Sequence, residues 1–326
     1  MVLKRLDRMF TYRHAMTLAD LKHEARFGPV VPKTVLVTGA TGLVGQALCA
    51  RLTTRGHRVK KVSRSPGPDT VVWSVAEGIL PGTALEGIDS VVHLAGEPIA
   101  QRWTPAVKKR IMDSRVASAR LLVDAILACD NRPAYISASG INAYHGAGEG
   151  PFEETDPMGD SFLAEVCKAW EGAADPLRAA DVPVTMMRTG VVLSGKGAAL
   201  AKMLPAFKLG IAGRLGSGTQ HFDWISLDDL VNQYLLAIEQ PEYVGVFNNV
   251  APQLTTNATF TQTLGRVIRR PAVMPAPAGL LKLIFGEMAE EALLCDVPAV
   301  PVALDALDYP WRLPDLTGCL RHELGL

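Results

Sequence analysis

Hydrophobic and polar positions follow two different periods along most of this chain. Short apolar runs predict buried strands, and longer segments with apolar residues at intervals of three and four predict helices. From residue 34 the two kinds of segment alternate, which predicts an α/β fold with a doubly wound parallel sheet. The expected strands are residues 34–37, 59–63, 70–73, 90–94, 134–137 and 182–188, with helices at 43–52, 104–129 and 162–177.

The first expected strand and helix are joined by a loop that contains Gly39, Gly42 and Gly45. Glycine allows backbone dihedrals that other residues avoid, and it lets a ligand approach the chain closely. The helix that follows directs free N–H groups and its positive dipole end at this loop, which favours a phosphate. The pattern predicts a Rossmann-type dinucleotide site; a glycine-rich turn without a ligand is the alternative. The expected contacts are Gly39, Thr41, Gly42, Leu43, Val44 and Gly45.

The end of the second expected strand reads Ser63-Arg64 and has no acidic side chain. An acid at this position binds the adenosine ribose hydroxyl of NAD, whereas a base pairs with the 2′-phosphate of NADP. We therefore expect NADP as the cofactor, bound by Ser63 and Arg64 with help from Lys60 or Lys61. The alternative is a solvated surface arginine.

Residues after the later strands are expected to complete the cofactor site, because ligands of open α/β sheets bind beyond the carboxyl ends of the strands. Small residues there allow the cofactor to pass close to the backbone. Glu97, a little further on, could either orient a substrate or cap a loop. The expected contacts are Leu94, Ala95, Gly96, Ser137, Arg188 and Gly190.

The fifth expected strand runs into the segment from Ser137 to His145, where we expect the chemistry. Ser139 could polarise a carbonyl or hydroxyl group, and Tyr144 or His145 could move a proton. The alternatives are that Ser139 caps a turn and that Tyr144 only packs.

The N-terminal segment has a short capped helix suggested by Thr17 and Asp20. It is either a docking arm or a loosely packed extension, and the second is favoured because termini are often poorly ordered. A helical segment is expected at 280–294. The expected parts are an N-terminal extension and linker at 1–32, an NADP-binding domain at 33–250 with substrate loops at about 194–225, and a small C-terminal cap at 251–326.

Composition narrows the classes of function. The 326 residues include 33 basic and 33 acidic side chains, so no net charge attracts the chain to nucleic acid or an anionic membrane. The five cysteines are scattered without a Cys-x-x-Cys pair, which argues against a disulfide framework and a metal site. No stretch has the pattern of a signal peptide or a membrane span, so we expect a cytoplasmic protein with a small-molecule substrate.

Several short motifs, in this order, resemble the extended short-chain dehydrogenase/reductase superfamily. The resemblance covers about residues 33–326 and is most specific to the atypical branch of epimerase family proteins with a C-terminal domain of unknown function. It implies a Rossmann domain, a nicotinamide cofactor and a substrate region made by the later loops and the cap. The motifs are Val35–Gly45, Leu94–Ile99 with Arg102–Thr104, Ile136–Ser139, Phe162–Ala164 with Trp170-Glu171, Arg188–Leu193, Met203–Pro205, Gly216–Ser217–Gly218 with Gln220, Trp224-Ile225 with Asp228-Asp229, and Gly286-Glu287.

The segment from Leu6 to His14 looks like the connector that follows a lipid-binding-like helix-grip domain in some relatives. The resemblance therefore implies a helix-grip domain as a partner for the N-terminal arm. The arm is either a remnant, or the chain is a shortened version of a longer protein.

The chain departs from the superfamily at its catalytic pair. Active members carry Tyr-x-x-x-Lys on the helix after the fifth strand, where the tyrosine exchanges a proton and the lysine lowers the tyrosine pKa. Counting back from Glu171, these positions fall at about Leu163 and Cys167. Lys168 is adjacent, but it lies about one hundred degrees around the helix.

The leading hypothesis is an NADP-dependent oxidoreductase or epimerase-like enzyme that acts on a small carbonyl or hydroxyl substrate. Ser139 would be the polarising group, Tyr144 the substitute acid and Lys168 a weaker helper. The alternative is a non-catalytic NADP(H)-binding sensor, which the missing tyrosine and lysine favour. Helices 104–129 and 162–177 could also form the face of a homodimer, as they often do in related folds.

Overall fold

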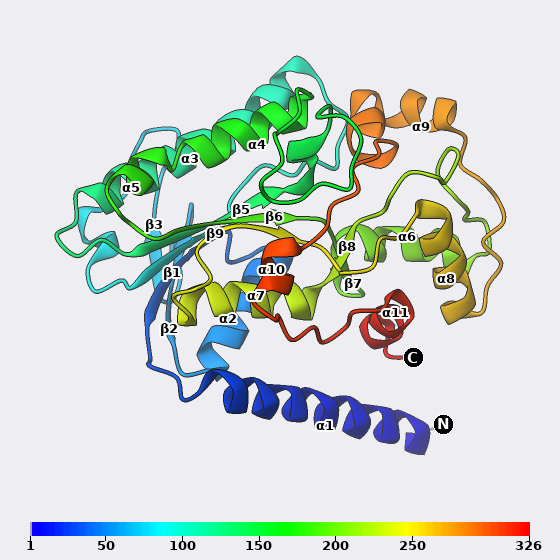
Figure 1. The fold of residues 1–326 in the computed structure, drawn as a ribbon, viewed down its shortest axis with the longest axis horizontal. Helices are drawn as coiled ribbons and strands as arrows, with labels where there is room; N and C mark the ends of the chain where they lie inside the picture. Colours follow the sequence, from blue (N-terminus) through cyan, green and yellow to red (C-terminus); the bar gives the residue numbers. More distant parts are fainter. Residues whose placement is uncertain (1) are drawn as a thin grey trace.

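The computed structural model describes residues 2–326 and is built around a seven-stranded sheet (Figure 1). Neighbouring strands are parallel throughout, in the order β3-β2-β1-β4-β5-β6-β9. The doubly wound α/β fold is thereby confirmed, and the order changes direction between β1 and β4. The strands are β1 (Thr34–Thr38), β2 (Arg58–Ser63), β3 (Thr70–Val72), β4 (Ser90–His93), β5 (Ala134–Gly140), β6 (Val184–Thr189) and β9 (Gly245–Asn249).

Helices cover both faces of this sheet (Figure 1). Val35 and Val37 belong to the core on the side of α2 and α7, whereas Leu36 belongs to the core on the side of α3. Burial on both faces explains why β1 is continuously apolar. The helices of one face are α2 (Leu43–Thr54) and α7 (Leu227–Glu239); those of the other are α3 (Pro105–Leu127), α4 (Phe162–Gly172) and α5 (Asp175–Ala179).

One expectation about these elements is wrong, and one strand was not predicted. The single helix expected at 162–177 is two helices, α4 and α5. Pro176, at the start of α5, has no N–H to donate to the carbonyl of Gly172, so the helix cannot continue through it. β9 was missed because Gly245–Asn249 is short and ends in two asparagines; it pairs with β6 at the edge of the sheet.

A second, smaller core lies beyond the carboxyl end of β6. The parallel pair β7 (Val191–Ser194) and β8 (Trp224–Ser226) carries α6 (Ala198–Lys208), α8 (Asn257–Ile268) and α11 (Leu316–Leu324). The C-terminal region thus shares a core with the 194–225 segment. The remaining elements are η1 (Gly82–Leu85), η2 (Ile141–Tyr144), α9 (Ala278–Phe285), the π-helical turn η3 (Ala289–Leu293) and α10 (Val302–Ala306).

Asp229 ties the C-terminal segment to the start of α7. Ser226 caps the helix by accepting a hydrogen bond from the Asp229 amide. The Asp229 carboxylate itself accepts hydrogen bonds from the amides of Arg312 and Leu313 and from the hydroxyl of Tyr309. The carboxylate therefore fixes the segment that leads into α11, in addition to serving the end of its own helix.

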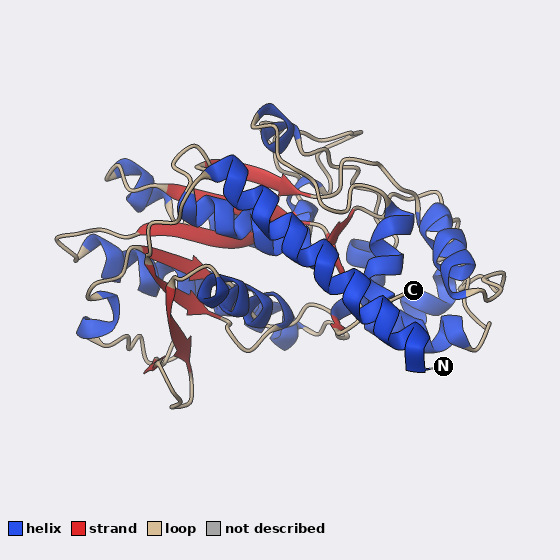
Figure 2. Cartoon of the chain, turned by 90° about the horizontal axis from the view of Figure 1, so that it is seen from below, coloured by secondary structure: helices blue, strands red, loops and turns tan. Residues whose placement is uncertain are grey.

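The N-terminal segment is one long helix, α1 (Val2–Phe27), so the expectation of a short helix in a loosely packed extension is wrong. The Asp20 carboxylate pairs with Arg51 at 2.7 Å and with Arg312 at 3.0 Å. The rings of Tyr12 and His322 lie 5.1 Å apart. Figure 2 shows α1 running along the molecule toward the C-terminal end of the chain. These contacts dock α1 against both α2 and the segment around α11.

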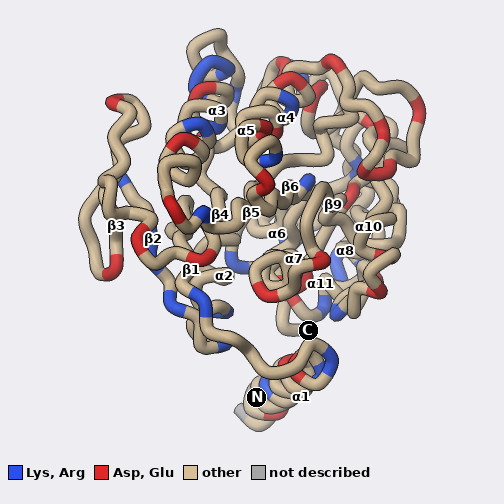
Figure 3. The backbone as a smooth tube through the Cα atoms, turned by 60° about the vertical axis from the view of Figure 1, so that its left-hand side comes forward, with Lys and Arg blue, Asp and Glu red and all other residues tan. Residues whose placement is uncertain are grey.

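Acidic and basic residues are interspersed over the helices in Figure 3. Among the residues that the structure describes, no helix combines the length and the apolar character needed to cross a membrane.

Candidate cofactor and active site

The glycine loop after β1 is shaped by close backbone packing. Gly39 has φ +67°, and a Cβ there would lie 2.8 Å from the carbonyl carbon of Leu94. A Cβ on Gly45 would lie 2.2 Å from the carbonyl oxygen of Gly39. Gly42 is exposed at the N-terminal end of α2. Gly39 and Gly45 therefore pack the loop against β4 and the helix, while Gly42 leaves the amide end of α2 open to a ligand.

The other loop residues lie on the open side of this turn. Thr41 is exposed, and Leu43 and Val44 are half-buried in the first turn of α2. The N-cap position makes no side-chain hydrogen bond to the helix. Free backbone N–H groups at a helix start bind anions well, so this geometry fits the pyrophosphate of a dinucleotide.

The end of β2 lies beside this loop, because Thr38 of β1 is in register with Val62. Ser63 is half-buried and its hydroxyl accepts a hydrogen bond from the amide of Ser65. Arg64 is exposed, and its side chain forms no salt bridge or hydrogen bond within residues 2–326. The guanidinium is available to a phosphate at the edge of the cofactor site.

A buried chain of hydrogen bonds holds the ends of β1 and β4. The Thr38 hydroxyl accepts from the amides of Leu94 and Ala95, at 3.1 and 3.2 Å, and contacts Nδ1 of His93 at 2.9 Å. Because that hydroxyl already accepts, its proton goes to Nδ1, and Nε2–H of His93 donates to Ser118 at 3.0 Å. Burial lowers the pKa of His93 to about 3, so the ring is neutral. The network fixes the backbone along which Leu94 and Ala95 face the loop.

Gly96 and Ser137, two further expected cofactor contacts, do not face the glycine loop as Leu94 and Ala95 do. Gly96 is exposed, and a Cβ there would lie 3.1 Å from the guanidinium carbon of Arg115. Ser137 has no exposed surface and donates a hydrogen bond to the carbonyl of Ala138. Gly96 therefore borders the site, whereas Ser137 supports the sheet behind it.

Ser139 sits at the end of β5 in a buried network. Its hydroxyl donates to Oε1 of Glu171 at 2.7 Å. The Glu171 carboxylate is also held by Arg188, whose Nε and Nη2 donate to its two oxygens. A paired carboxylate only accepts hydrogen bonds, so the single Ser139 proton is committed to Glu171. Toward any further group, the Ser139 oxygen can therefore act only as a hydrogen-bond acceptor.

Tyr144 and Arg188 belong to the interior of this network. The Tyr144 hydroxyl accepts from Nη1 of Arg188 at 2.7 Å and donates to Oδ1 of Asn248 at 2.8 Å. Tyr144 has no exposed surface and stacks on Phe152, and burial raises its pKa. Arg188 is only 4% exposed. In this structure both side chains hold β5, β6 and β9 together and neither reaches solvent.

The remaining predicted residues also serve local packing. Lys168 points to solvent and pairs with Glu165 at 2.8 Å. A Cβ on Gly190 would lie 2.5 Å from the carbonyl oxygen of Asp223, so this glycine lets β7 leave β6 close to the segment before β8. His145 lies 3.9 Å from Glu291.

The positions equivalent to the superfamily's tyrosine and lysine, Leu163 and Cys167, contact the cap and the end of β5 respectively. The amide of Leu163 donates to Oε2 of Glu291, and that of Phe162 donates to Oε1. Cys167 is buried, with its thiol 3.6 Å from the carbonyl of Gly140. Glu291 thus binds the N-terminal end of α4 and fastens the cap beside Ser139.

Arg115 is a functional candidate that the sequence pattern missed. Its guanidinium lies over the ring of Trp170 and donates to the carbonyl of Glu97. Burial lowers the pKa of Arg115, and the Cys167 thiol lies close enough to affect it. Arg115 therefore brings a cation near the position where the superfamily has its lysine. The signal was the nearby Trp170, a large aromatic surface for a cation.

Asp223 is a second missed candidate. It lies next to Gly190 and is 7% exposed, and burial raises its pKa to about 8. Its charge also affects Cys295, whose thiol lies 3.8 Å from Nδ2 of Asn142 in the turn after Ser139. Asp223 therefore places a buried carboxyl group with a raised pKa next to Gly190, at the end of β6.

Fold and site together define a Rossmann protein of the extended short-chain dehydrogenase/reductase class. Residues 35–250 match the model of the NAD dependent epimerase/dehydratase family, and residues 276–323 match a domain of unknown function, DUF1731. The chain belongs to the NAD dependent epimerase/dehydratase family. The recognised branch, with its C-terminal domain of unknown function, is thereby confirmed.

Solved and curated relatives agree with this placement. Human epimerase family protein SDR39U1 (isoform 2), solved with NADPH, is 34% identical with a TM-score of 0.81, covering 90% of this chain and 100% of that chain. A nucleoside-diphosphate sugar epimerase from Corynebacterium glutamicum is 34% identical with a TM-score of 0.83, covering 98% of this chain and 64% of that chain. The chloroplastic SDR39U1 homolog of Arabidopsis thaliana is 38% identical over 324 residues, covering 95% of this chain and 90% of the relative.

Proposed function

We propose that this protein binds NADP(H) and uses it to oxidise or reduce a small substrate at a carbon that bears a hydroxyl or carbonyl group. The observation that carries the proposal is the cradle formed by Gly39, Gly42 and Gly45 beside the unpaired guanidinium of Arg64. Human SDR39U1, whose solved structure aligns with 90% of this chain, was crystallised with NADPH. This supports the same cofactor here.

The residues present fit such a cofactor. The 2.2 Å separation between a Cβ at Gly45 and the Gly39 carbonyl leaves no room for a side chain in the loop. The Gly42 amide donates to the Gly39 carbonyl at 3.0 Å, so the amides at the start of α2, beginning with Leu43, are the ones that can approach a pyrophosphate. Arg64 would pair with the 2′-phosphate, and Leu94, Ala95 and Gly96 would line the other side. When bound, the nicotinamide would accept or supply a hydride at the substrate carbon.

Ser139 is proposed to orient the substrate. Because its proton is held by Glu171, its oxygen would accept a hydrogen bond from a substrate hydroxyl. This role replaces the polarising role expected from the sequence, in which Ser139 would donate to a carbonyl.

We also propose Asp223, in place of Tyr144, as the group that moves the substrate proton. A carboxyl group with a pKa near 8 can give up and regain a proton around neutral pH. The Arg115 guanidinium, which lies over Trp170 and beside Gly96, would supply positive charge at the border of the cofactor site.

The test is turnover of a panel of aldehydes, ketones and nucleotide sugars, followed as oxidation of NADPH. We expect at least one class to react, and we expect Ser139→Ala and Asp223→Asn to slow it while Asp130→Asn, at an exposed position before β5, does not. Unchanged rates in both site variants would contradict the assigned roles.

The leucine and cysteine at the superfamily's catalytic positions favour a second candidate, a sensor that binds NADP(H) without chemistry. It predicts tight NADPH binding and no turnover with any compound of the panel.

A further inference from the structure

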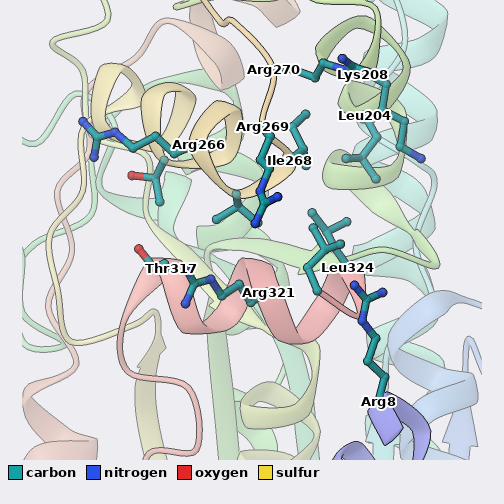
Figure 4. Close-up of a pocket in the computed structure, with 13 residues that line it drawn as sticks. Arg8, Leu204, Lys208, Arg266, Ile268, Arg269, Arg270, Thr317, Arg321 and Leu324 are labelled. Carbon is teal, nitrogen blue, oxygen red and sulfur yellow. The ribbon is translucent and has the colours of Figure 1, made fainter. Parts of the chain in front are cut away.

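We propose a second ligand site, for a small organic phosphate, in a cavity that is separate from the cofactor cradle. The cavity has a volume of about 930 Å³ and lies where the C-terminal ends of α6, α8 and α11 meet α1 (Figure 4). We call it the basic cavity because six cations line it and no acidic side chain does. They are Arg8, Lys208, Arg266, Arg269, Arg270 and Arg321.

The cations of the basic cavity have no protein counter-ions. None of the six forms a salt bridge with a carboxylate in the described part of the chain. Arg51 and Arg312, by contrast, both pair with Asp20. Three helix C-termini supply about half a negative charge each, and the terminal carboxylate of Leu326, which also lines the cavity, supplies one more, so six cations leave a positive excess. An anionic ligand would offset it.

Arg269 is held in an unusual backbone conformation. It ends α8 in the left-handed region, with φ +56° and ψ +50°, where glycine or asparagine is usual. A non-glycine residue there is strained, and such strain is concentrated at functional sites. In Figure 4 its side chain extends from the end of α8 toward α11, and Arg8 extends from α1 toward the same space near Leu324. Arg269 and Arg8, which belong to different elements, therefore face the same space.

The apolar part of the wall defines the rest of the ligand. Leu204, Val267, Ile268 and Leu324 line the same cavity. Arginine guanidinium groups match phosphate oxygens in a bidentate manner, and several of them suit more than one phosphate charge. We therefore assign the cavity to a molecule that carries a phosphate or pyrophosphate group next to an apolar portion.

Calorimetric titration of the full chain tests this assignment. The cofactor cradle is first saturated with NADPH, and geranyl pyrophosphate and inorganic pyrophosphate are then titrated separately. We expect geranyl pyrophosphate to bind, more tightly than inorganic pyrophosphate, and its affinity to fall with rising salt. If neither probe binds, the proposal is wrong. Equal affinities would overturn the apolar part of the assignment.

Two variants locate the binding. Arg269→Asn removes a charge but keeps a residue that tolerates the left-handed conformation, and Arg321→Gln removes an exposed charge from α11. Each is expected to weaken geranyl pyrophosphate binding about tenfold or more. Arg120→Gln, an exposed arginine on α3, is the matched control and should bind as wild type does. Wild-type affinity in both cavity variants would place the anion elsewhere and contradict the proposal.

Discussion

Arg188 donates two hydrogen bonds to Glu171, from Nε to Oε1 at 2.9 Å and from Nη2 to Oε2 at 3.0 Å. Both side chains are almost fully buried between β6 and α4. The Glu171 carboxylate also accepts a hydrogen bond from the Ser139 hydroxyl at 2.7 Å. A buried ion pair therefore fixes the orientation of the Ser139 hydroxyl.

Glu171→Gln should destabilise the protein strongly, because it leaves the buried Arg188 guanidinium without its counter-charge. We expect the free energy of unfolding in urea to fall by about 3–5 kcal/mol. The control is Glu165→Gln on the same helix, an exposed residue whose loss should cost less than about 1 kcal/mol. Similar losses in the two variants would show that the buried pair contributes no more than a surface pair.

Gly45→Ala should abolish binding of NADPH, because the added methyl group meets the Gly39 carbonyl at 2.2 Å and must displace the loop. The measurement is quenching or enhancement of NADPH fluorescence on titration with protein. Gly279→Ala is the control: it lies in α9 with open space around it, so binding should be unchanged. Normal binding by Gly45→Ala would contradict the role given to the loop.

The raised pKa of Asp223 predicts that the free energy of unfolding depends on pH. Its pKa rises from 3.8 to about 8 on folding, so between these values the folded protein holds a proton that the unfolded chain has lost. Stability from this group is therefore complete below about pH 4 and is lost as pH rises toward 8, with a slope of up to about 1.4 kcal/mol per pH unit.

The comparison of unfolding free energies at pH 5 and pH 7.5 checks this slope. Asp223→Asn should lose less stability over that interval than wild type, whereas the exposed Asp130→Asn should behave as wild type does. Parallel pH profiles for wild type and Asp223→Asn would count against a buried, protonated carboxyl group.

The regular elements near β1 could be predicted from the sequence because periodicity, turn residues and the glycine spacing all agree there. α1 could not, since its exposed length has no continuous apolar stripe and its end is fixed by ion pairs such as Asp20 with Arg51. The homodimer face and the helix-grip partner stay predictions of the sequence.

The site was predicted less completely than the fold. The order of strands along the sequence predicts that Ser139, Tyr144 and Arg188 lie near one edge of the sheet. It does not show whether these side chains are buried in a hydrogen-bond network or line an open cleft. Glu171 carried a usable signal, because it follows Leu163 and Cys167 at intervals of eight and four, on the buried side of α4. An acid on such an apolar face needs a buried partner, and Arg188 supplies it.

The most direct test of the account is a fluorescence titration of NADPH and NADH into wild type and Arg64→Ala, with Arg58→Ala at the opposite end of β2 as control. We expect wild type and Arg58→Ala to bind NADPH about tenfold or more tighter than NADH, and Arg64→Ala to lose that preference by weakening NADPH alone. Equal weakening of both cofactors, or an unchanged preference in Arg64→Ala, would contradict the account.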